Sequence, residues 1–405
     1  MSDANSSDII VIGAGLAGGF TAHAFAKRGA RVRILESSHD LATKASGNRF
    51  ALLTPYITTK ASSLATLYSA GYAFSSSLFS SLDELTEVFR RCGALQLPAS
   101  DRLAAALADR DPLIGLPNTK RVSSQEASTL CGLELSFPAF HVSDAGFIEP
   151  RVTLARLLDK HRASLSVQYR ARAVSLLRTG NSWGITCDDG SVYYASKIII
   201  CGAYEATSLA PCEWLPLEAI RGQTVSVAPS CLTKNLRTVI TFGGYITPAV
   251  SGYHFLGAHY RHNDSRTTPL DSDTSDIYVR YSKWLPAAQL NTTEVVGARV
   301  CFRTSTVDRL PYIGALPDFA GMGLAASNFR SGTEIRNKVP ISHLQGVFIN
   351  LGHGSRGLLS CPIGGELVAR IASGQALAEL TDAAETVSPD RLPYSLLRRK
   401  LPNNE

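Results

Sequence analysis

The stretch DIIVIGAGLAGGFTAHAFAKRGARVRILE, residues 8–36, decides the fold of this chain. Its first apolar residues, 9–12, favour a β-strand, and a Gly-x-Gly-x-x-Gly turn follows them. Apolar residues then recur at helical spacing, and a second apolar strand covers residues 31–35. This order of strand, glycine turn, helix and strand predicts a dinucleotide-binding unit, with a βαβ unit that binds nothing as the alternative.

The glycines of this turn have separate tasks. Gly13 permits the tight turn, Gly15 lets a pyrophosphate approach the backbone, and Gly18 lets the helix pack closely on the strand. The positive end of the helix favours the anion. Glu36 ends the second strand, where a carboxylate accepts hydrogen bonds from a ribose 2′-OH and repels a 2′-phosphate. The predicted cofactor-binding residues here are Gly13, Gly15, Leu16, Ala17, Gly18 and Glu36. FAD and NAD both fit this pattern, and its place at the start of the chain favours FAD.

Composition restricts the class of protein. The chain has 405 residues, of which 45% are hydrophobic and 18% charged, so we expect a globular protein of two domains. No apolar run reaches the roughly 18 to 20 residues of a membrane span. The polar start, MSDANSSD, does not resemble a secretory signal. The eight cysteines form no CxxC pair, so we expect a cytoplasmic protein without a metal site. Since no apolar run is long enough to span a membrane, we also expect no membrane contact. The net charge of +6 is compatible with a nucleic-acid partner but does not require one.

Sequence patterns outline the rest of the chain. Helical spacing extends over residues 62–92, 99–110 and the segment after 123, and a short helix is expected at 150–158. Strands are expected at 166–169, 173–177, 183–187 and 192–194, followed by a buried parallel strand at 197–203. Strands without intervening helices follow at 224–227, 238–241, 245–250, 254–258 and 294–302, apart from one helix at 274–285. A strand at 346–351, a turn at 353–357 and a helix at 360–373 come last.

These patterns predict an α/β and α+β fold, in which a Rossmann-like, glutathione-reductase-like FAD-binding domain carries an inserted antiparallel-sheet substrate domain. The FAD-binding domain is expected to consist of residues 1–80, 146–220 and 345–405. The substrate domain is expected to consist of residues 81–145 and 221–344.

Beyond this pattern, the chain resembles the D-amino-acid-oxidase-type flavoprotein superfamily, and within it the FAD-dependent oxidase domain of the bifunctional tRNA 5-methylaminomethyl-2-thiouridine biosynthesis enzymes. The matching segments are 13–36, 45–49 with Pro55, 92–97, 221–223, 244–249, Arg303 with 308–311, 314–318 and 352–358. The segments GYITP and DRLP are fairly specific to these enzymes. Two positions depart from their pattern, because Phe50-Ala51 replaces Gln-Gly and Thr54 replaces a tyrosine.

The resemblance implies bound FAD, molecular oxygen as the second substrate, and tRNA as the partner. It implies oxidative release of a carboxymethyl group, as glyoxylate, from 5-carboxymethylaminomethyl-(2-thio)uridine at the wobble position, which leaves an aminomethyl group. The methyltransferase half of the bifunctional enzymes has no counterpart here, so a separate methyltransferase is expected to act on the product. The alternatives are a small-molecule amine or amino-acid oxidase of the glycine or sarcosine oxidase type, and a dinucleotide-binding protein without catalytic activity.

The resemblance also implies roles for single residues. Arg303 is expected to hold the substrate carboxylate, Tyr245 to form a hydrogen-bonding wall, and Arg356 to add a second positive group near the flavin. The other predicted cofactor-binding residues are Ser46, Gly47, Asn48, Val174, Gly202, Gly352, Gly354, Ser355, Gly357 and Leu358. Each role has a structural alternative: Arg303 could pair with Asp308, Tyr245 could be core packing, Arg356 and His353 could be turn residues, and residues 46–48 could be an ordinary loop.

Cys301 raises a further question about the cofactor. Its position relative to Asp308 is the one at which the similar sarcosine oxidases carry a flavin-linked cysteine. A small buried thiol without such a bond is the favoured interpretation.

Overall fold

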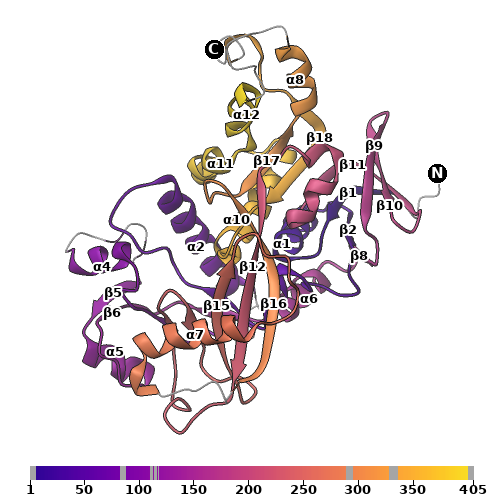
Figure 1. Cartoon of the computed structure of the whole chain (residues 1–405). Coiled ribbons are helices and arrows are strands. Elements are labelled where there is room, and N and C mark those ends of the chain that lie inside the picture. The colour runs from indigo at the N-terminus through magenta and orange to yellow at the C-terminus, as the bar shows by residue number, and fades with distance from the viewer. Residues whose placement is uncertain are drawn as a thin grey trace.

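The computed structural model describes residues 6–82, 88–109, 113, 116, 118–288, 295–327 and 336–399. Within these residues two large sheets lie one above the other in the view of Figure 1, and the long strands β12 (Leu217–Val227) and β16 (Val295–Thr306) of the second reach toward the first. No helix among them is long and apolar enough to cross a membrane.

The first sheet contains the predicted dinucleotide-binding unit. Its main path has the order β17-β18-β11-β1-β2-β8, and β9 and β10 extend it beside β11 as antiparallel neighbours. All pairs from β18 to β8 are parallel, as in doubly wound nucleotide-binding folds. The strands are β1 (Ser6–Ile12), β2 (Val32–Glu36), β8 (Leu165–Tyr169), β9 (Ala173–Thr179), β10 (Ser182–Cys187), β11 (Val192–Ile200), β17 (Tyr312–Pro317) and β18 (His343–Leu351).

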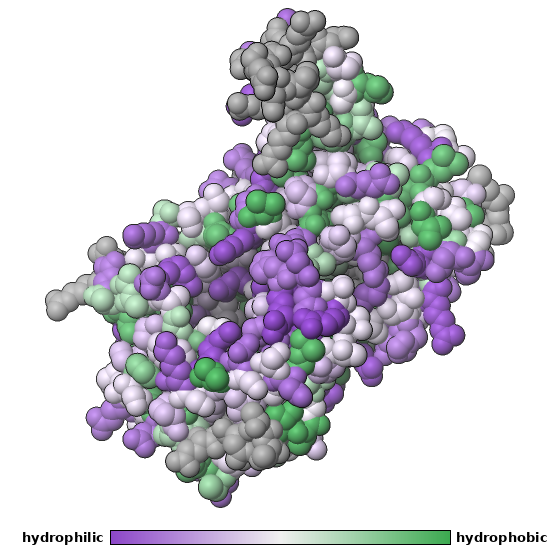
Figure 2. Space-filling model, in the orientation of Figure 1, coloured by the Kyte–Doolittle hydropathy of each residue, from purple (hydrophilic) through white to green (hydrophobic). Residues whose placement is uncertain are grey.

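The second sheet is antiparallel except for one parallel pair, β13 with β4, and has the order β16-β12-β15-β14-β13-β4-β6-β5. A separate two-stranded pair joins β3 to β7. The strands are β3 (Ala51–Leu53), β4 (Ala94–Gln96), β5 (Thr119–Val122), β6 (Ala139–Val142), β7 (Gly146–Ile148), β12 (Leu217–Val227), β13 (Val239–Thr241), β14 (Tyr245–Ile246), β15 (His254–Arg261) and β16 (Val295–Thr306). On the face that Figure 2 shows, hydrophilic residues gather over β12, β15 and β16.

Helices cover both sheets. The helices α1, α2 and α10 pack together, and α5 and α7 lie against the second sheet with its own apolar core. Gly365 of α10 lets the backbones of α10 and α1 come close, because a Cβ at this position would lie 2.8 Å from backbone atoms of Phe20. The helices are α1 (Leu16–Ala26), α2 (Ser63–Ser81), α4 (Asp101–Ala108), α5 (Ser124–Cys131), α6 (Pro150–Asp159), α7 (Asp271–Trp284), α8 (Phe319–Ala326), α10 (Gly357–Ala372), α11 (Thr381–Val387) and α12 (Pro393–Arg399).

The fold class is confirmed, and several element boundaries differ from the sequence prediction. The segments 192–194 and 197–203 were expected as two strands, but one strand, β11, covers both and ends at Ile200. Its residues 192–195 pair with β10, and its residues 194–200 pair with β1. The helix expected over 62–92 ends at Ser81, and residues 83–87 lie outside the described part of the chain. The proposed domain division stays a prediction. Strand β17, in the segment assigned to the substrate domain, bonds to β18 in the first sheet.

Candidate active site

A cavity of about 540 Å³ lies where the two sheets meet, and we call it the central cavity. Its walls come from the turn after β1, the segment 42–54, the strands β12 to β16 and the loop that precedes α10. Of the predicted site residues, it is lined by Gly13, Gly15, Leu16, Ala17, Glu36, Ser46, Asn48, Gly202, Tyr245, Arg303, Gly352, Gly354, Ser355, Arg356, Gly357 and Leu358. Segments that are distant in sequence are therefore brought together as the sequence predicts.

The glycine turn has the geometry that a pyrophosphate needs. Gly13 has a positive φ of 102°, and a Cβ on Gly18 would lie only 1.8 Å from the carbonyl oxygen of Gly13. The first residue thus makes the turn and the last allows the helix to approach it, while Gly18 itself does not line the central cavity. Gly15 faces Ser46, whose Oγ accepts a hydrogen bond from the Leu16 N–H at 3.0 Å.

Glu36 ends β2 and is only 6% exposed. Its Oε2 accepts a hydrogen bond from the Ala14 N–H at 2.6 Å, and its Oε1 accepts one from the Ser38 N–H at 2.8 Å. These bonds hold the carboxylate at the edge of the glycine turn, on the wall of the central cavity.

Arg299 fixes the loop that carries Asn48. Its guanidinium donates hydrogen bonds to the Asn48 Oδ1 at 2.7 Å and to the carbonyl oxygens of Thr43 and Lys44 at 3.0 and 2.6 Å. A Cβ on Gly47 would lie 2.5 Å from this guanidinium, so Gly47 makes room for Arg299 and does not line the cavity. Sequence patterns gave no signal for Arg299, because its partners lie more than 250 residues away.

The loop before α10 forms the opposite wall. Gly352 and Gly354 both have positive φ values, and the Gly354 N–H donates to the carbonyl oxygen of Thr304 at 2.8 Å. The His353 Nδ1 lies 2.9 Å from the Ser360 Oγ, and burial lowers the pKa of His353 to about 4, so this imidazole is neutral at neutral pH. The backbone therefore presents the N-terminus of α10 to the central cavity, where partial positive charge favours electron-rich groups.

Val174 was expected at the cofactor and lies elsewhere. Its side chain is 46% exposed and does not line the central cavity, whereas its neighbour Ala173 does. Side chains alternate between the two faces of a strand, so the adjacent residue of β9 faces inward. A role of Val174 at the cofactor therefore stays a prediction.

Arg303 lies on β16 and lines the central cavity. Its guanidinium carbon is 3.4 Å from the ring centroid of Tyr260, and its Nε is buried without a hydrogen-bond partner. Burial lowers the pKa of Arg303. Asp308 instead receives a hydrogen bond from the Arg391 Nε at 2.8 Å, so the alternative of an Arg303–Asp308 pair is wrong.

Tyr245 on β14 also lines the central cavity. A Cβ on Gly257 would lie 2.7 Å from its ring, so a glycine on the neighbouring strand accommodates the ring. Burial raises the pKa of Tyr245, which keeps the phenol protonated and able to donate a hydrogen bond at neutral pH.

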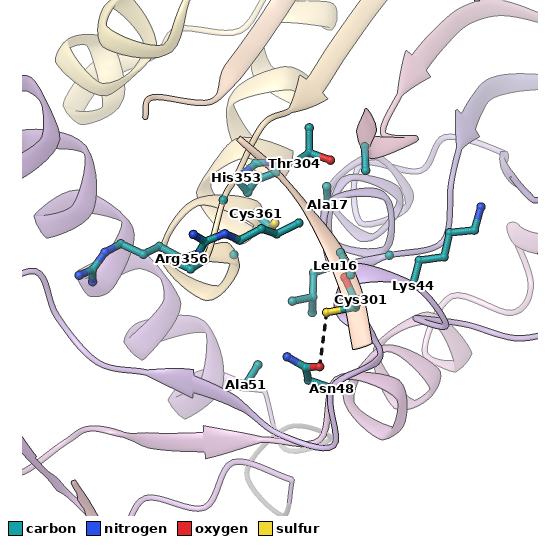
Figure 3. A pocket seen from close by; sticks show the side chains of 18 of the residues that line it. Leu16, Ala17, Lys44, Asn48, Ala51, Cys301, Thr304, His353, Arg356 and Cys361 are labelled. Atoms are coloured by element: carbon teal, nitrogen blue, oxygen red, sulfur yellow. Dashed lines mark hydrogen bonds between the residues drawn. The ribbon is translucent and has the colours of Figure 1, made fainter. Parts of the chain in front are cut away.

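Arg356 precedes α10, and its side chain extends away from His353 toward α2 (Figure 3). Its guanidinium carbon lies 5.1 Å from the ring centroid of Tyr56 and 5.5 Å from that of Tyr68. Arg102 of α4 lies over the same Tyr56 ring at 4.2 Å and lines the central cavity too. Nothing in the local sequence around Arg102 indicated a site residue, because an arginine in the first turn of an amphipathic helix is usually a surface residue.

Cys301 and Asn48 face each other across the cavity wall, with the thiol 3.7 Å from the Asn48 Oδ1 (Figure 3). Cys301 lines the central cavity, and its bond to a flavin stays an open prediction.

One group in the described segments, His259, Asp273 and Asp276, has metal-ligand spacing. The Asp273 carboxylate in that group already pairs with Arg221 and Arg261.

The family model of FAD-dependent oxidoreductases, DAO, matches residues 8–371. The chain belongs to the FAD-dependent oxidoreductase family. Its cofactor is FAD, and the residues of the central cavity fit that group. The glycine turn and the α1 N-terminus suit the pyrophosphate, Glu36 is held beside them, and the α10 N-terminus faces the other end of the same cavity.

Curated relatives and solved structures agree with this family. The chain is 30% identical over 401 residues to the tRNA 5-methylaminomethyl-2-thiouridine biosynthesis bifunctional protein MnmC of Stutzerimonas stutzeri, covering 96% of this chain and 59% of that protein. It is 31% identical over 410 residues to the protein of the same name from Ectopseudomonas mendocina, covering 98% and 61%. The chain thus spans about three-fifths of the length of these relatives.

The fold is similar to that of two solved structures. Glycine oxidase from Geobacillus kaustophilus has a TM-score of 0.72 at 20% identity, with 94% of this chain and 98% of that chain covered. L-proline dehydrogenase from P. horikoshii has a TM-score of 0.72 at 18% identity, with 98% and 100% covered.

Proposed function

We propose that this oxidoreductase oxidises the CH–NH group of 5-carboxymethylaminomethyl-(2-thio)uridine at the wobble position of tRNA. The carboxymethyl group leaves as glyoxylate, the aminomethyl group stays on the base, and molecular oxygen is reduced to peroxide. The observation that carries the proposal is Arg303, a cation on the cavity wall without a carboxylate partner among the described residues. Whole-chain similarity to the MnmC proteins supports tRNA as the substrate.

The reaction balances without further reactants. The secondary amine, oxygen and one water molecule yield the primary amine, glyoxylate and hydrogen peroxide. When bound, FAD accepts the hydride from the carboxymethyl carbon and passes the electrons to oxygen. The protein therefore has to orient this carbon and keep the amine in its neutral form.

The side chains of the central cavity suit that positioning task. The planar guanidinium of Arg303 can hold the carboxylate through two parallel hydrogen bonds. Tyr245, whose phenol stays protonated, is placed to donate a further bond. Several positive groups line the cavity, and positive charge disfavours a protonated amine in the same place. A methyltransferase would then act on the primary amine.

A small-molecule oxidase of the glycine or sarcosine oxidase type is the second candidate. The observation in its favour is the fold, because glycine oxidase aligns over nearly the whole chain. An N-carboxymethyl amine would bind Arg303 in the same way in either case, so the two candidates differ in what is attached to the nitrogen.

The Arg303→Lys variant tests the role of this residue. Lysine keeps the charge but lacks the planar pair of donors. Because a hydrogen bond to a charged group contributes about 1.5 to 3 kcal/mol, we expect the rate of single-turnover flavin reduction by carboxymethylaminomethyl-bearing tRNA to fall about ten- to hundredfold, with FAD retained. Arg162→Lys, a change at an exposed arginine, is the control. Unimpaired reduction in Arg303→Lys would remove this residue from the active site.

Salt provides an independent test of the tRNA partner. Binding that neutralises backbone phosphates weakens steeply as salt concentration rises. We therefore expect the tRNA concentration needed for half-maximal reduction to rise with salt, while reduction by free glycine or sarcosine, if any, changes little. Reduction by tRNA that is insensitive to salt would count against tRNA as the substrate.

A further inference from the structure

Three arginines that lie over tyrosine rings line the central cavity. Arg303 lies over Tyr260, Arg356 over Tyr56 and Tyr68, and Arg102 over the same Tyr56. Arg102, Arg303 and Arg356 all line the cavity. They come from α4, β16 and the turn before α10, so three distant segments converge on the cavity.

Among the described residues, no carboxylate balances the charges of these three arginines. None of the three arginines forms a salt bridge with a carboxylate in the segments that the structure describes, and burial lowers the pKa of each. Two arginines elsewhere are paired: the half-buried Arg28 binds Glu366 at 2.6 Å, and the buried Arg221 binds Asp273. The three cavity arginines are half-buried, and withdrawing an unpaired charge from water costs free energy, so we expect a ligand to supply their pairing partners.

A substrate carboxylate bound at Arg303 would neutralise only one of the three positive charges. The guanidinium carbons of Arg102 and Arg356 lie 4.2 and 5.1 Å from the centroid of the same Tyr56 ring, and besides burial the charge of Arg102 contributes to lowering the pKa of Arg356, so the two cations are close enough to interact. The Arg102 Nη1 also donates to the carbonyl oxygen of Ile57, which fixes its direction.

We propose that Arg102 and Arg356 form a second anion subsite, which binds another anionic group of the same substrate whose carboxylate binds Arg303. This inference rests on the proposed function. The group is a phosphodiester of the nucleotide that carries the amine, or a second carboxylate if the substrate is a small amino diacid. The phosphodiester is favoured because whole-chain similarity to the MnmC proteins supports a tRNA substrate, whose phosphates arginines can neutralise.

Two pairs of substrates test the subsite with the FAD-loaded protein. The first pair is the 5-carboxymethylaminomethyluridine nucleoside and its 3′,5′-bisphosphate, and the second is sarcosine and iminodiacetate. In each pair only the second member has the extra anion. The preference for the substrate with the extra anion is measured as its kcat/KM divided by that of the other substrate in the pair. We expect Arg102→Gln to lower this ratio about tenfold in one of the two pairs. Arg162→Gln, a change at an exposed arginine, should leave both ratios as they are.

The pair in which the ratio falls identifies the source of the anion. Equal loss of kcat/KM on both members of both pairs would overturn the subsite. Arg356→Gln provides a second variant if Arg102→Gln does not fold, and Arg102→Lys should restore part of the preference because it keeps the charge. Flavin content of each variant separates a loss of cofactor from a loss of recognition.

The same data separate this inference from the proposed function. If the protein oxidises iminodiacetate but neither nucleotide substrate, the tRNA reaction is wrong while the second pair still tests the subsite. If the nucleotides are oxidised and Arg102→Gln leaves the bisphosphate preference unchanged, the subsite is wrong and the tRNA reaction stands.

Discussion

Glu366→Gln is expected to loosen the two helices whose N-termini face the cofactor. Glu366 lies on α10 and is 4% exposed. It binds Lys27 at 2.8 Å and Arg28 at 2.6 Å just after α1, and Arg370 at 2.9 Å one turn along α10. Burial raises the pKa of this carboxyl, and the hydrogen bonds from Arg28, Lys27 and Arg370 outweigh burial and lower it to about 2.

The magnitude follows from this pKa. The ordinary value is 4.5, and a difference of one pKa unit corresponds to about 1.4 kcal/mol, so the charged form contributes about 3 kcal/mol to folding. Glutamine keeps the shape of the side chain and loses the charge. We expect the free energy of unfolding at pH 7 to fall by about 3 kcal/mol, measured by urea unfolding, with weaker retention of FAD.

The pH dependence has a defined sign. Because the pKa is lower in the folded state, the contribution of Glu366 is complete above about pH 5 and disappears as the pH falls toward 2. The difference between the native protein and Glu366→Gln should therefore shrink in acid. Glu379→Gln is the control. The Glu379 side chain is 69% exposed, and its contact with Arg370 is longer, at 3.4 Å, so we expect the free energy of unfolding to change by no more than about 0.5 kcal/mol. Equal stability of Glu366→Gln and the native protein at pH 7, or a difference that grows in acid, would refute the reasoning.

Two predictions concern the cofactor. Gly15→Val should abolish flavin retention, because even a Cβ at this position lies 3.1 Å from the Ser46 Oγ and a larger side chain enters the pyrophosphate position; a fully yellow variant on purification would show that the turn is misassigned. Acid precipitation tests Cys301, and we expect the flavin in the supernatant, as for a thiol that only contacts Asn48; flavin that stays with the precipitate would establish a covalent bond.

Local patterns predicted the parts of this fold that local physics determines. The glycines after β1 require a turn and a close helix, and the apolar runs of β1 and β2 must be buried, so the first unit was readable from residues 8–36. The strand β11 was read as two pieces because it passes from an antiparallel neighbour, β10, to a longer parallel one, β1, and its side-chain pattern changes along its length.

The rest depended on contacts between distant segments. Arg102 becomes part of the site only because α4 packs near the loop at residues 55–57, and Arg299 only because β16 passes the loop that carries Asn48. Similarly, Asp308 is five residues from Arg303 in sequence, yet it pairs with Arg391. Arginine partners are set by tertiary packing, which sequence spacing does not encode.

Incubation of the FAD-loaded protein with tRNA bearing carboxymethylaminomethyl groups, followed by mass analysis of its nucleosides, tests the central claim most directly. We expect the carboxymethyl group to disappear from the wobble uridine, and glyoxylate and peroxide to appear in equal amounts. Unchanged tRNA, together with peroxide release from free glycine or sarcosine, would contradict it.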